Sequence, residues 1–385
     1  MTAVSDNAFT FIETAEQLEA FANEWLPRLD GAPLALDIEE DRERHYDPCV
    51  ALIQLTVEDD DFVLDPLSLP PRPLAAVLEM VCLTPSIVVV HGARNDVGGL
   101  KRDFGFGPLN LRDTQIAARF LARERFGLAA LLDDTFGIEL DKQMRRSDWT
   151  RRPLSDEQLA YARADTSWLL DLWDALEPEV IEAGWHDAML EECAALADAP
   201  SDQPTFDPCG WTSVKGARSL DERGHARLAV LWRWREEVGE AFDLHPSRVI
   251  PPWAMKNLAE RGASLLKRPK VPGVHPEVLS EERDRLADLL RDAPPAPRKP
   301  RPKRKIHRRL AGPSVQDRVT ALLDWRTNEA RATGLDSGFL APRSLIEALA
   351  RCEPDPDAYA EVEDVRQWRL DRYADAWADA IRSLT

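Results

Sequence analysis

Two carboxylates lie two residues apart in an apolar stretch near the N-terminus. Asp37 and Glu39 stand in the segment 34–39 (LALDIE), whose composition predicts a β-strand. Because side chains alternate along a strand, both carboxylates point to the same face of a sheet. Two like charges on one face repel each other, and a bound cation would relieve that repulsion. The pair therefore suggests a metal site, although a strand that ended at Ile38 would leave both acids merely solvated.

Two later segments supply further oxygen ligands. Asp96 follows the apolar run 87–90 within HGARND. An acid just beyond a strand lies where open α/β sheets bind ligands, although it could equally cap a helix. Tyr161 and Asp165 stand four residues apart in a predicted helix, so one lies above the other on a single face. Such a pair is also an ordinary feature of a surface helix, and only the set as a whole indicates chemistry.

The other metal-binding residue types narrow the kind of ion. The five cysteines are scattered without a close pair, which excludes a disulfide framework and a cysteine-type zinc site. The seven histidines show no paired ligand spacing. Any bound metal must therefore be a hard cation held by oxygen ligands.

The elements that position these residues alternate between strands and helices up to about residue 195. Strand patterns cover four segments, 34–39, 50–56, 62–64 and 87–90. Thr14 caps a predicted amphipathic helix, and apolar residues keep helical spacing from Leu159 to Leu176. After residue 215 only helical patterns remain. We therefore expect an α/β domain followed by all-α modules.

Composition marks the boundaries between these modules. Residues 291–309 carry nine basic residues, one acid and five prolines, which is typical of a solvated linker. A softer boundary lies at 197–207, where Pro, Asp and Ser cluster. A repeat at a constant offset of 91 residues matches Trp234 with Trp325 and five further residues with their counterparts. Two similar helical modules therefore flank the linker.

The motifs together resemble those of ribonuclease D, in the DEDDy superfamily of 3′–5′ exonucleases. The resemblance rests on LALDIE at 34–39, HGARNDVGGL at 91–100 and YARAD at 161–165, and most specifically on the run SDW…RPLS…Q…YA…D. The repeated modules resemble HRDC domains. The resemblance implies an α/β, RNase H-like exonuclease domain, with a mixed sheet and flanking helices, followed by two all-α modules. The implied boundaries are 1–200 for the exonuclease domain, 211–292 and 313–385 for the HRDC-like domains, and 293–312 for the basic Pro-rich linker.

The same resemblance implies roles for the site residues. The catalytic set is Asp37, Glu39, Asp96, Tyr161 and Asp165, and its four carboxylates would hold two divalent cations, Mg²⁺ or Mn²⁺. Asp37 would bridge both ions, Glu39 and Asp165 would hold the water-activating ion, and Asp96 would serve the other. Tyr161 would orient the attacking water. Two such ions can activate water, neutralise a phosphate and stabilise the leaving 3′-oxygen, as phosphodiester hydrolysis requires.

Two positions qualify the match. The family usually has Thr between the first two acids, where this chain has Ile38. Strand alternation points that side chain away from the acids, so the metal site is expected to survive. Asp113 also matches a family position, but its expected role is to cap a helix, and it stays outside the catalytic set.

A basic run lies close in sequence to the third motif. Its members, Lys142, Arg145, Arg146, Arg151 and Arg152, are candidate phosphate contacts, and a solvated charged loop is the alternative. The favoured function is a metal-dependent exoribonuclease that trims the 3′ ends of structured RNA such as tRNA precursors and releases 5′-mononucleotides. A 3′–5′ DNA exonuclease of the same superfamily and a catalytically silent nucleic-acid-binding scaffold are the alternatives.

The chain of 385 residues has a formal net charge of −19, which argues mildly against a nucleic-acid partner. That charge is uneven, because residues 1–65 hold 17 acids and three basic residues. No aliphatic run approaches the ~20 residues that span a bilayer, and the N-terminal stretch lacks the basic start of a signal peptide. A cytoplasmic protein without a membrane partner is expected, and the resemblance implies a monomer.

Overall fold

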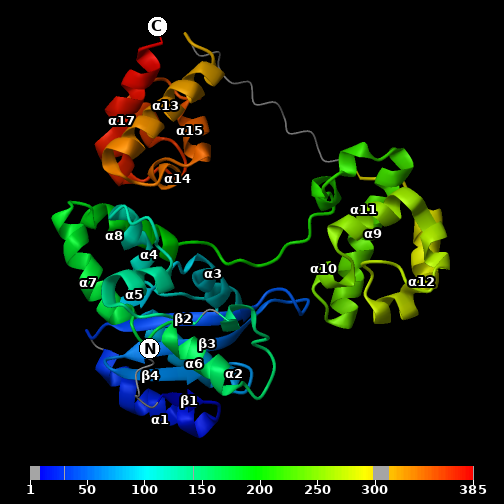
Figure 1. Ribbon diagram of the computed structural model, residues 1–385, viewed down its shortest axis with the longest axis horizontal. Helices are drawn as coiled ribbons and strands as arrows, with labels where there is room; N and C mark the ends of the chain where they lie inside the picture. The colour runs from blue at the N-terminus through cyan, green and yellow to red at the C-terminus, as the bar shows by residue number, and fades with distance from the viewer. Residues whose placement is uncertain (1–8, 30, 142, 298–311, 385) are drawn as a thin grey trace. The chain divides into compact units, whose positions relative to one another are not determined.

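The computed structural model describes residues 9–29, 31–141, 143–297 and 312–384, and it divides into two compact units (Figure 1). The first unit combines the chain up to Glu39, Ala51–Asp202 and the C-terminal segment. The second unit combines Glu40–Val50 with the segment that begins at Gln203. Among the described residues, no helix is both long and apolar enough to cross a membrane.

A mixed sheet forms the centre of the first unit. Its strand order is β1 (Thr10–Ile12), β4 (Asp60–Leu64), β3 (Cys49–Val57), β2 (Leu34–Asp41), β5 (Val88–Val90) and β6 (Leu111–Asp113). β1 runs parallel to β4, β3 antiparallel to β4, and β2, β5 and β6 are parallel neighbours. The predicted α/β class and all four predicted strands are confirmed. The two three-residue edge strands, β1 and β6, were not predicted because they are too short to show alternation.

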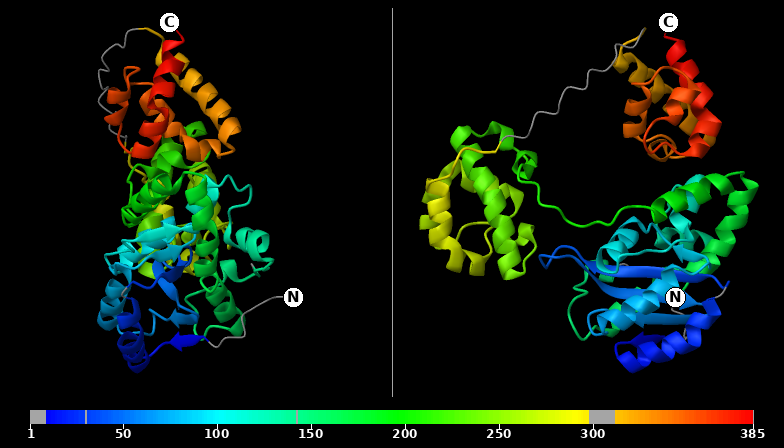
Figure 2. Two further views of the ribbon diagram at one scale, coloured as in Figure 1. Left: turned by 90° about the vertical axis from the view of Figure 1, so that its left-hand side faces the viewer. Right: turned by 180° about the vertical axis from the view of Figure 1, so that it is seen from behind.

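Helices cover this sheet (Figures 1 and 2). They are α1 (Ala15–Trp25), α2 (Pro71–Cys82), α3 (Arg94–Asp103), α4 (Thr114–Phe120), α5 (Leu128–Phe136), α6 (Asp156–Ala164), α7 (Leu169–Glu182) and α8 (His186–Ala197). The predicted cap at Thr14 is confirmed, because its side chain accepts a hydrogen bond from the Gln17 amide. α6 contacts β4, α7 contacts β5 and α8 contacts β6. The helices therefore bring the third motif onto the central sheet.

The apolar stripe from Leu159 to Leu176 predicted one helix, and that prediction is wrong. α6 ends at Ala164 and α7 begins at Leu169. Thr166 in the intervening turn shares a 3.0 Å hydrogen bond with Thr56 of β3. Since tertiary context can override local helix propensity, contacts with the sheet outweigh the local pattern here.

The two helical modules lie after the sheet domain in the sequence. The first comprises α9 (Glu222–Phe242), α10 (Pro246–Val249), α11 (Pro252–Arg261) and α12 (Pro276–Arg291). The C-terminal module comprises α13 (Val315–Thr333), α14 (Ser337–Leu340), α15 (Arg343–Leu349), α16 (Pro356–Ala360) and α17 (Gln367–Arg382). Adding 91 to the bounds of α10 and α12 (246–249 and 276–291) gives those of α14 and α17 (337–340 and 367–382). The offset seen in the sequence is thus an offset of whole helices.

Candidate active site

Three of the predicted ligands come together at one point of the first unit. Asp37 and Glu39 lie on β2, which continues to Asp41, and Asp165 is the C-terminal cap of α6. One possible ligand atom from each lies within 4.8 Å of the others, and all three side chains are partly buried. β2 therefore does not end at Ile38, and its two acids meet the third motif rather than open solvent. Three carboxylates at this spacing form an oxygen-donor set that can hold a divalent cation.

Asp96 is not one of the three residues whose ligand atoms lie within 4.8 Å of one another, but its charge acts on Asp37. It occupies the first turn of α3, just beyond β5. Its charge is the largest influence on the pKa of Asp37 after burial, ahead of Asp165 and Glu39. The four predicted carboxylates thus converge, with Asp96 approaching from the α3 side.

Crowding and burial make the site's carboxyl groups hard to ionise. The pKa of Asp37 is raised well above its usual range by burial and then by the three neighbouring carboxylates. Burial raises the pKa of Asp165 to about 7, although a hydrogen bond from Tyr161 and the charge of Arg145 oppose that rise. A divalent cation would supply the positive charge that this set lacks, so the residues fit such an ion.

Tyr161 is held as a protonated phenol beside Asp165. Its hydroxyl donates a hydrogen bond to Asp165. Burial and the charges of Asp165, Glu39 and Asp37 all raise its pKa above the ordinary value of 10.0. The buried ring of Trp149 stacks at a tilt on the phenol, with ring centroids 5.9 Å apart. The hydroxyl can therefore orient a partner but cannot act as a base near neutral pH.

A buried polar network fixes the turn that carries Asp165. Asp61, at the start of β4, accepts hydrogen bonds from Arg163 Nε (2.6 Å), Ser167 Oγ (2.8 Å) and Thr56 Oγ1 (2.7 Å). Arg163 and Asp61 are both almost fully buried. Sequence spacing did not reveal this network, because Arg163 and Ser167 lie 102 and 106 residues from Asp61, and the only signal was an arginine inside the third motif.

Asp113 fixes the segment that carries Asp96. Its buried carboxylate caps α4 through the amides of Gln115 (2.8 Å) and Ile116 (3.3 Å), as predicted. It also accepts the amides of Gly92 (2.9 Å) and Ala93 (3.1 Å), which stand directly before α3. One side chain at the end of β6 therefore holds the β5–α3 turn, a role that sequence spacing did not reveal.

The structure separates the members of the basic run. Arg145 is exposed, and its charge reaches both Tyr161 and Asp165. Arg146 and Arg151 are exposed on the same segment. Lys142 lies outside the described residues.

Arg152 is turned inward instead. Its guanidinium donates two 2.6 Å hydrogen bonds to the fully buried Asp65 and a 2.8 Å bond to the Ala51 carbonyl. Burial tends to raise the pKa of Asp65, but the bonds from Arg152 and Ser68 outweigh it and the pKa is lowered. Arg152 therefore braces β3 and the end of β4.

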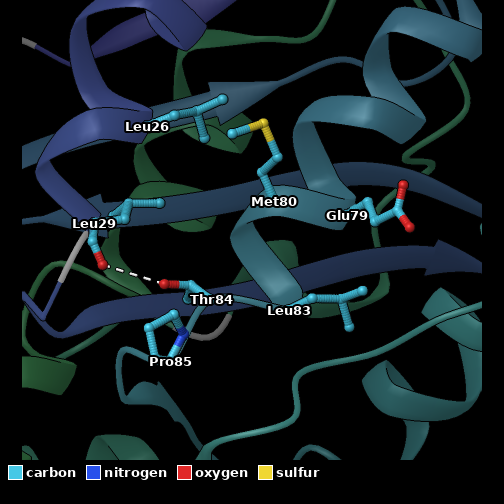
Figure 3. A pocket seen from close by; sticks show the side chains of 7 residues that line it. All are labelled: Leu26, Leu29, Glu79, Met80, Leu83, Thr84 and Pro85. Carbon is cyan, nitrogen blue, oxygen red and sulfur yellow. Dashed lines mark hydrogen bonds between the residues drawn. The ribbon is translucent and has the colours of Figure 1, made fainter.

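A separate pocket lies away from these residues. Figure 3 shows it between Leu26 and Leu29 on one side and the end of α2 with Thr84 and Pro85 on the other. Thr84 Oγ1 donates a 3.1 Å hydrogen bond to the Leu29 carbonyl across it. The lining is mostly apolar and includes one acid, Glu79, so it offers no ligand set comparable to the carboxylate trio.

Two family models match the chain. The model described as a 3′–5′ exonuclease matches residues 9–181, which contain the whole sheet and all five predicted catalytic residues. This block is therefore similar to the 3′–5′ exonuclease family over its whole sheet. The HRDC domain model matches residues 315–381 of the C-terminal module. The predicted resemblance to ribonuclease D, an exonuclease block with an HRDC domain behind it, is confirmed.

Individual relatives agree with this organisation. The chain is 34% identical over 264 residues to the exosome complex component 10 homolog of Caenorhabditis elegans, covering 67% of this chain and 30% of that protein. It is 28% identical over 322 residues to ribonuclease D of Haemophilus influenzae, covering 83% of this chain and 79% of that protein. The crystal structure of Escherichia coli RNase D superimposes with a TM-score of 0.70 over 98% of this chain and 99% of that chain at 24% identity, which supports the fold. The chain spans 30%, 26% and 41% of three exosome-type relatives.

Proposed function

We propose that the protein is a divalent-metal-dependent 3′–5′ exoribonuclease of the ribonuclease D type. The observation that carries the proposal is the convergence of Asp37, Glu39 and Asp165 within 4.8 Å, inside a block similar to the 3′–5′ exonuclease family. Asp96 and Tyr161 complete the set. When bound there, two divalent cations would activate a water, neutralise the scissile phosphate and stabilise the leaving 3′-oxygen. Hydrolysis would release a nucleoside 5′-monophosphate and leave an RNA one residue shorter.

The protein's own groups would position the reactants. Asp37, Glu39, Asp96 and Asp165 would hold the ions, and the family resemblance assigns the bridging position to Asp37. Tyr161, kept protonated by its raised pKa, would orient the attacking water rather than deprotonate it. The hard oxygen donors favour Mg²⁺ or Mn²⁺ over softer metals.

Arg145 is the strongest proposed phosphate contact of the basic run, because its charge already acts on Asp165 and Tyr161. Arg146, Arg151 and Lys142 are proposed as additional contacts along the backbone. Arg152 is better assigned to bracing the sheet, since its guanidinium is bound to Asp65 and backbone carbonyls.

RNA with structured 3′ ends, such as a tRNA precursor, is the proposed substrate. The Escherichia coli RNase D, which shares the fold, is described as an exoribonuclease involved in structured RNA processing. We also propose 1–200 as the exonuclease domain, 211–292 and 313–385 as HRDC-like domains, and 293–312 as the linker. The helices that repeat at offset 91 support two such modules.

The decisive experiment is product analysis on matched oligomers. A 5′-labelled RNA should be shortened one residue at a time with added Mn²⁺ or Mg²⁺, release 5′-mononucleotides, and resist digestion when its 3′ end is blocked. A DNA oligomer of the same sequence should be digested more slowly. Faster digestion of DNA would support a DNA exonuclease, and binding without metal-dependent release would support a silent scaffold.

A further inference from the structure

A cavity of about 460 Å³ lies within the first unit, where the exonuclease block meets the C-terminal module. Its walls come from the β5–α3 turn, α4 and α8 on one side and from α14 and α17 on the other. Four arginines line it, Arg94, Arg119, Arg366 and Arg369. In a chain with a net charge of −19, such a concentration of arginine calls for an explanation.

The carboxylates of the cavity are already bound to donors. Asp113 accepts four backbone amides, as described above. Glu192 binds Arg369 Nη1 at 2.7 Å and Arg366 Nε at 3.4 Å. Asp336 accepts the Phe339 amide at 2.8 Å. Within the described residues these three acids are therefore engaged with partners other than Arg94 and Arg119.

Two guanidinium groups remain without a carboxylate among the described residues. Arg94 is exposed in the first turn of α3. Arg119 is held between the rings of Phe126 and Phe339, at 4.9 and 5.1 Å from their centroids, and its buried Nε has no hydrogen-bond acceptor in the described chain. A buried donor without an acceptor is costly, and a guanidinium fork matches phosphate oxygens. The cavity thus presents two guanidinium groups that no described carboxylate neutralises.

We propose that this cavity binds a backbone phosphate of the RNA, upstream of the 3′ end under cleavage; the proposal rests on the proposed function. Arg94 and Asp96 are two residues apart on α3 and so point to nearly opposite sides of its first turn. An RNA strand whose 3′ end lies at the carboxylates would cross this turn to reach the cavity. Phe339, the aromatic ring in the lining, is covered by Phe120 and Arg119. The cavity therefore offers charge to a phosphate rather than a stacking surface to a base.

The test measures binding rather than turnover, so it does not depend on the exonuclease assay. All variants are made in the full chain carrying Asp37→Asn. R94A, R119Q and the R94A/R119Q double variant are compared with a control, R72A. Arg72 is an exposed arginine of α2 that lines neither the cavity nor the carboxylate site. Fluorescence anisotropy gives Kd for a dinucleotide and for a single strand of about twelve nucleotides at several salt concentrations. The double variant should weaken binding of the long strand about tenfold or more, and the salt slope should fall by about one per arginine.

The effect should grow with RNA length and be absent in R72A. R119K, which keeps the charge, should retain most of the salt slope, and R94A guards against a folding defect because Arg94 is exposed. An equal loss on both RNA lengths, or no loss on the long strand, would overturn the proposal. So would competition by AMP or inorganic phosphate as effective as that by the long strand, since the cavity would then be a free-anion site.

Discussion

The first helical module and the C-terminal module repeat their helices at an offset of 91 residues, yet they meet different parts of the chain. The C-terminal module packs on the exonuclease block through Phe339 and Trp368. Phe339 lies edge-on to Phe120, and Trp368 meets both Phe120 and Trp185. At the same offset the first module has Arg248 and Glu277 (339 − 91 and 368 − 91). The aromatic residues that contact the exonuclease block, Phe339 and Trp368, are therefore present in the C-terminal module and not at the equivalent positions of the first module.

The first module contacts a different segment, the tip of the hairpin between β2 and β3. Asp243 binds His45 at 2.7 Å and accepts the Tyr46 amide at 3.2 Å. A Cβ at Gly239 would come within 2.8 Å of the Leu244 carbonyl oxygen and 3.2 Å of the Tyr46 ring, so a larger residue would force this contact to shift. The counterparts of Gly239 and Asp243 are an alanine at 330 and a glycine at 334. The two modules thus share their arrangement of helices, and residues that differ at a few equivalent positions determine which part of the chain each module contacts.

Among the described residues, the carboxylate cluster draws its ligands from the exonuclease block and none from either module, so the largest effect should come from that block. Asp37→Asn and Asp165→Asn should each lower kcat by more than about 10³-fold, because each removes a charged ligand from the proposed metal site. The melting temperature without metal should be unchanged or slightly higher, since the substitution relieves repulsion between the clustered carboxylates. Turnover near that of the wild type in either variant would show that the chemistry lies elsewhere.

Tyr161→Phe should lower kcat by about 10²-fold, because it removes a water-orienting contact made mainly in the transition state. Mn²⁺ affinity should barely change, since the phenol is not a proposed ligand. Calorimetric Mn²⁺ titration beside steady-state kinetics separates the two. Recovery of full kcat at saturating Mn²⁺ would contradict the orienting role.

A matched pair of substitutions tests the difference between the modules directly. Trp368→Ala should destabilise docking of the C-terminal module by about 3 kcal/mol, because it removes a large buried ring and the 2.9 Å bond from its Nε1 to Glu192. Glu277→Ala, at the equivalent exposed position, should stay within about 0.5 kcal/mol of wild type. Thermal unfolding and protease release of the C-terminal module report the effect. Similar losses in both variants would mean that the two modules are held alike.

The metal-free protein should lose stability as the pH rises, and this loss should belong to the exonuclease block. The pKa of Asp165 is raised to about 7 and that of Asp37 is also raised, so the folded state binds these protons more tightly than the unfolded state. The contribution of Asp165 is full below the unfolded-state pKa of about 4 and disappears as the pH rises through about 7. Melting temperatures between pH 5 and 8 should fall in EDTA more than in Mn²⁺. Asp165→Asn should flatten the EDTA profile, and an unchanged slope would reject this assignment.

The smallest effect concerns the hairpin contact of the first module. Asp243 has a φ of 49°, a conformation that favours glycine, and its carboxylate compensates by binding the hairpin. Asp243→Ala should cost about 1–2 kcal/mol, because it loses the exposed ion pair and keeps the backbone strain. Asp243→Gly loses the same bonds but relieves the strain, so its cost should be below about 1 kcal/mol. Chemical denaturation measures both, and equal costs would mean that strain plays no part.

Several features were determined by the sequence itself, because they depend on periodicity and local chemistry. Alternation on a strand placed Asp37 and Glu39 on one face, and a four-residue spacing placed Tyr161 over Asp165. The cap at Thr14 and the offset of 91 residues were equally local or repetitive signals. Each of these follows from positions along the chain and needs no knowledge of what lies across the sheet.

Only the tertiary structure decided which of several chemically similar residues lies at the candidate site and which one stabilises the fold. Arg145 and Arg152 belong to one basic run, yet Asp65, 87 residues from Arg152, binds that guanidinium, while the charge of Arg145 acts on Asp165. Asp113 could be predicted to cap a helix but not to hold the turn before Asp96, because that bond joins the ends of two neighbouring strands. The helix break after Ala164 and the arginine-lined cavity have the same origin. Burial and long-range partners set the energy of a polar side chain, and neither is written in its neighbours along the chain.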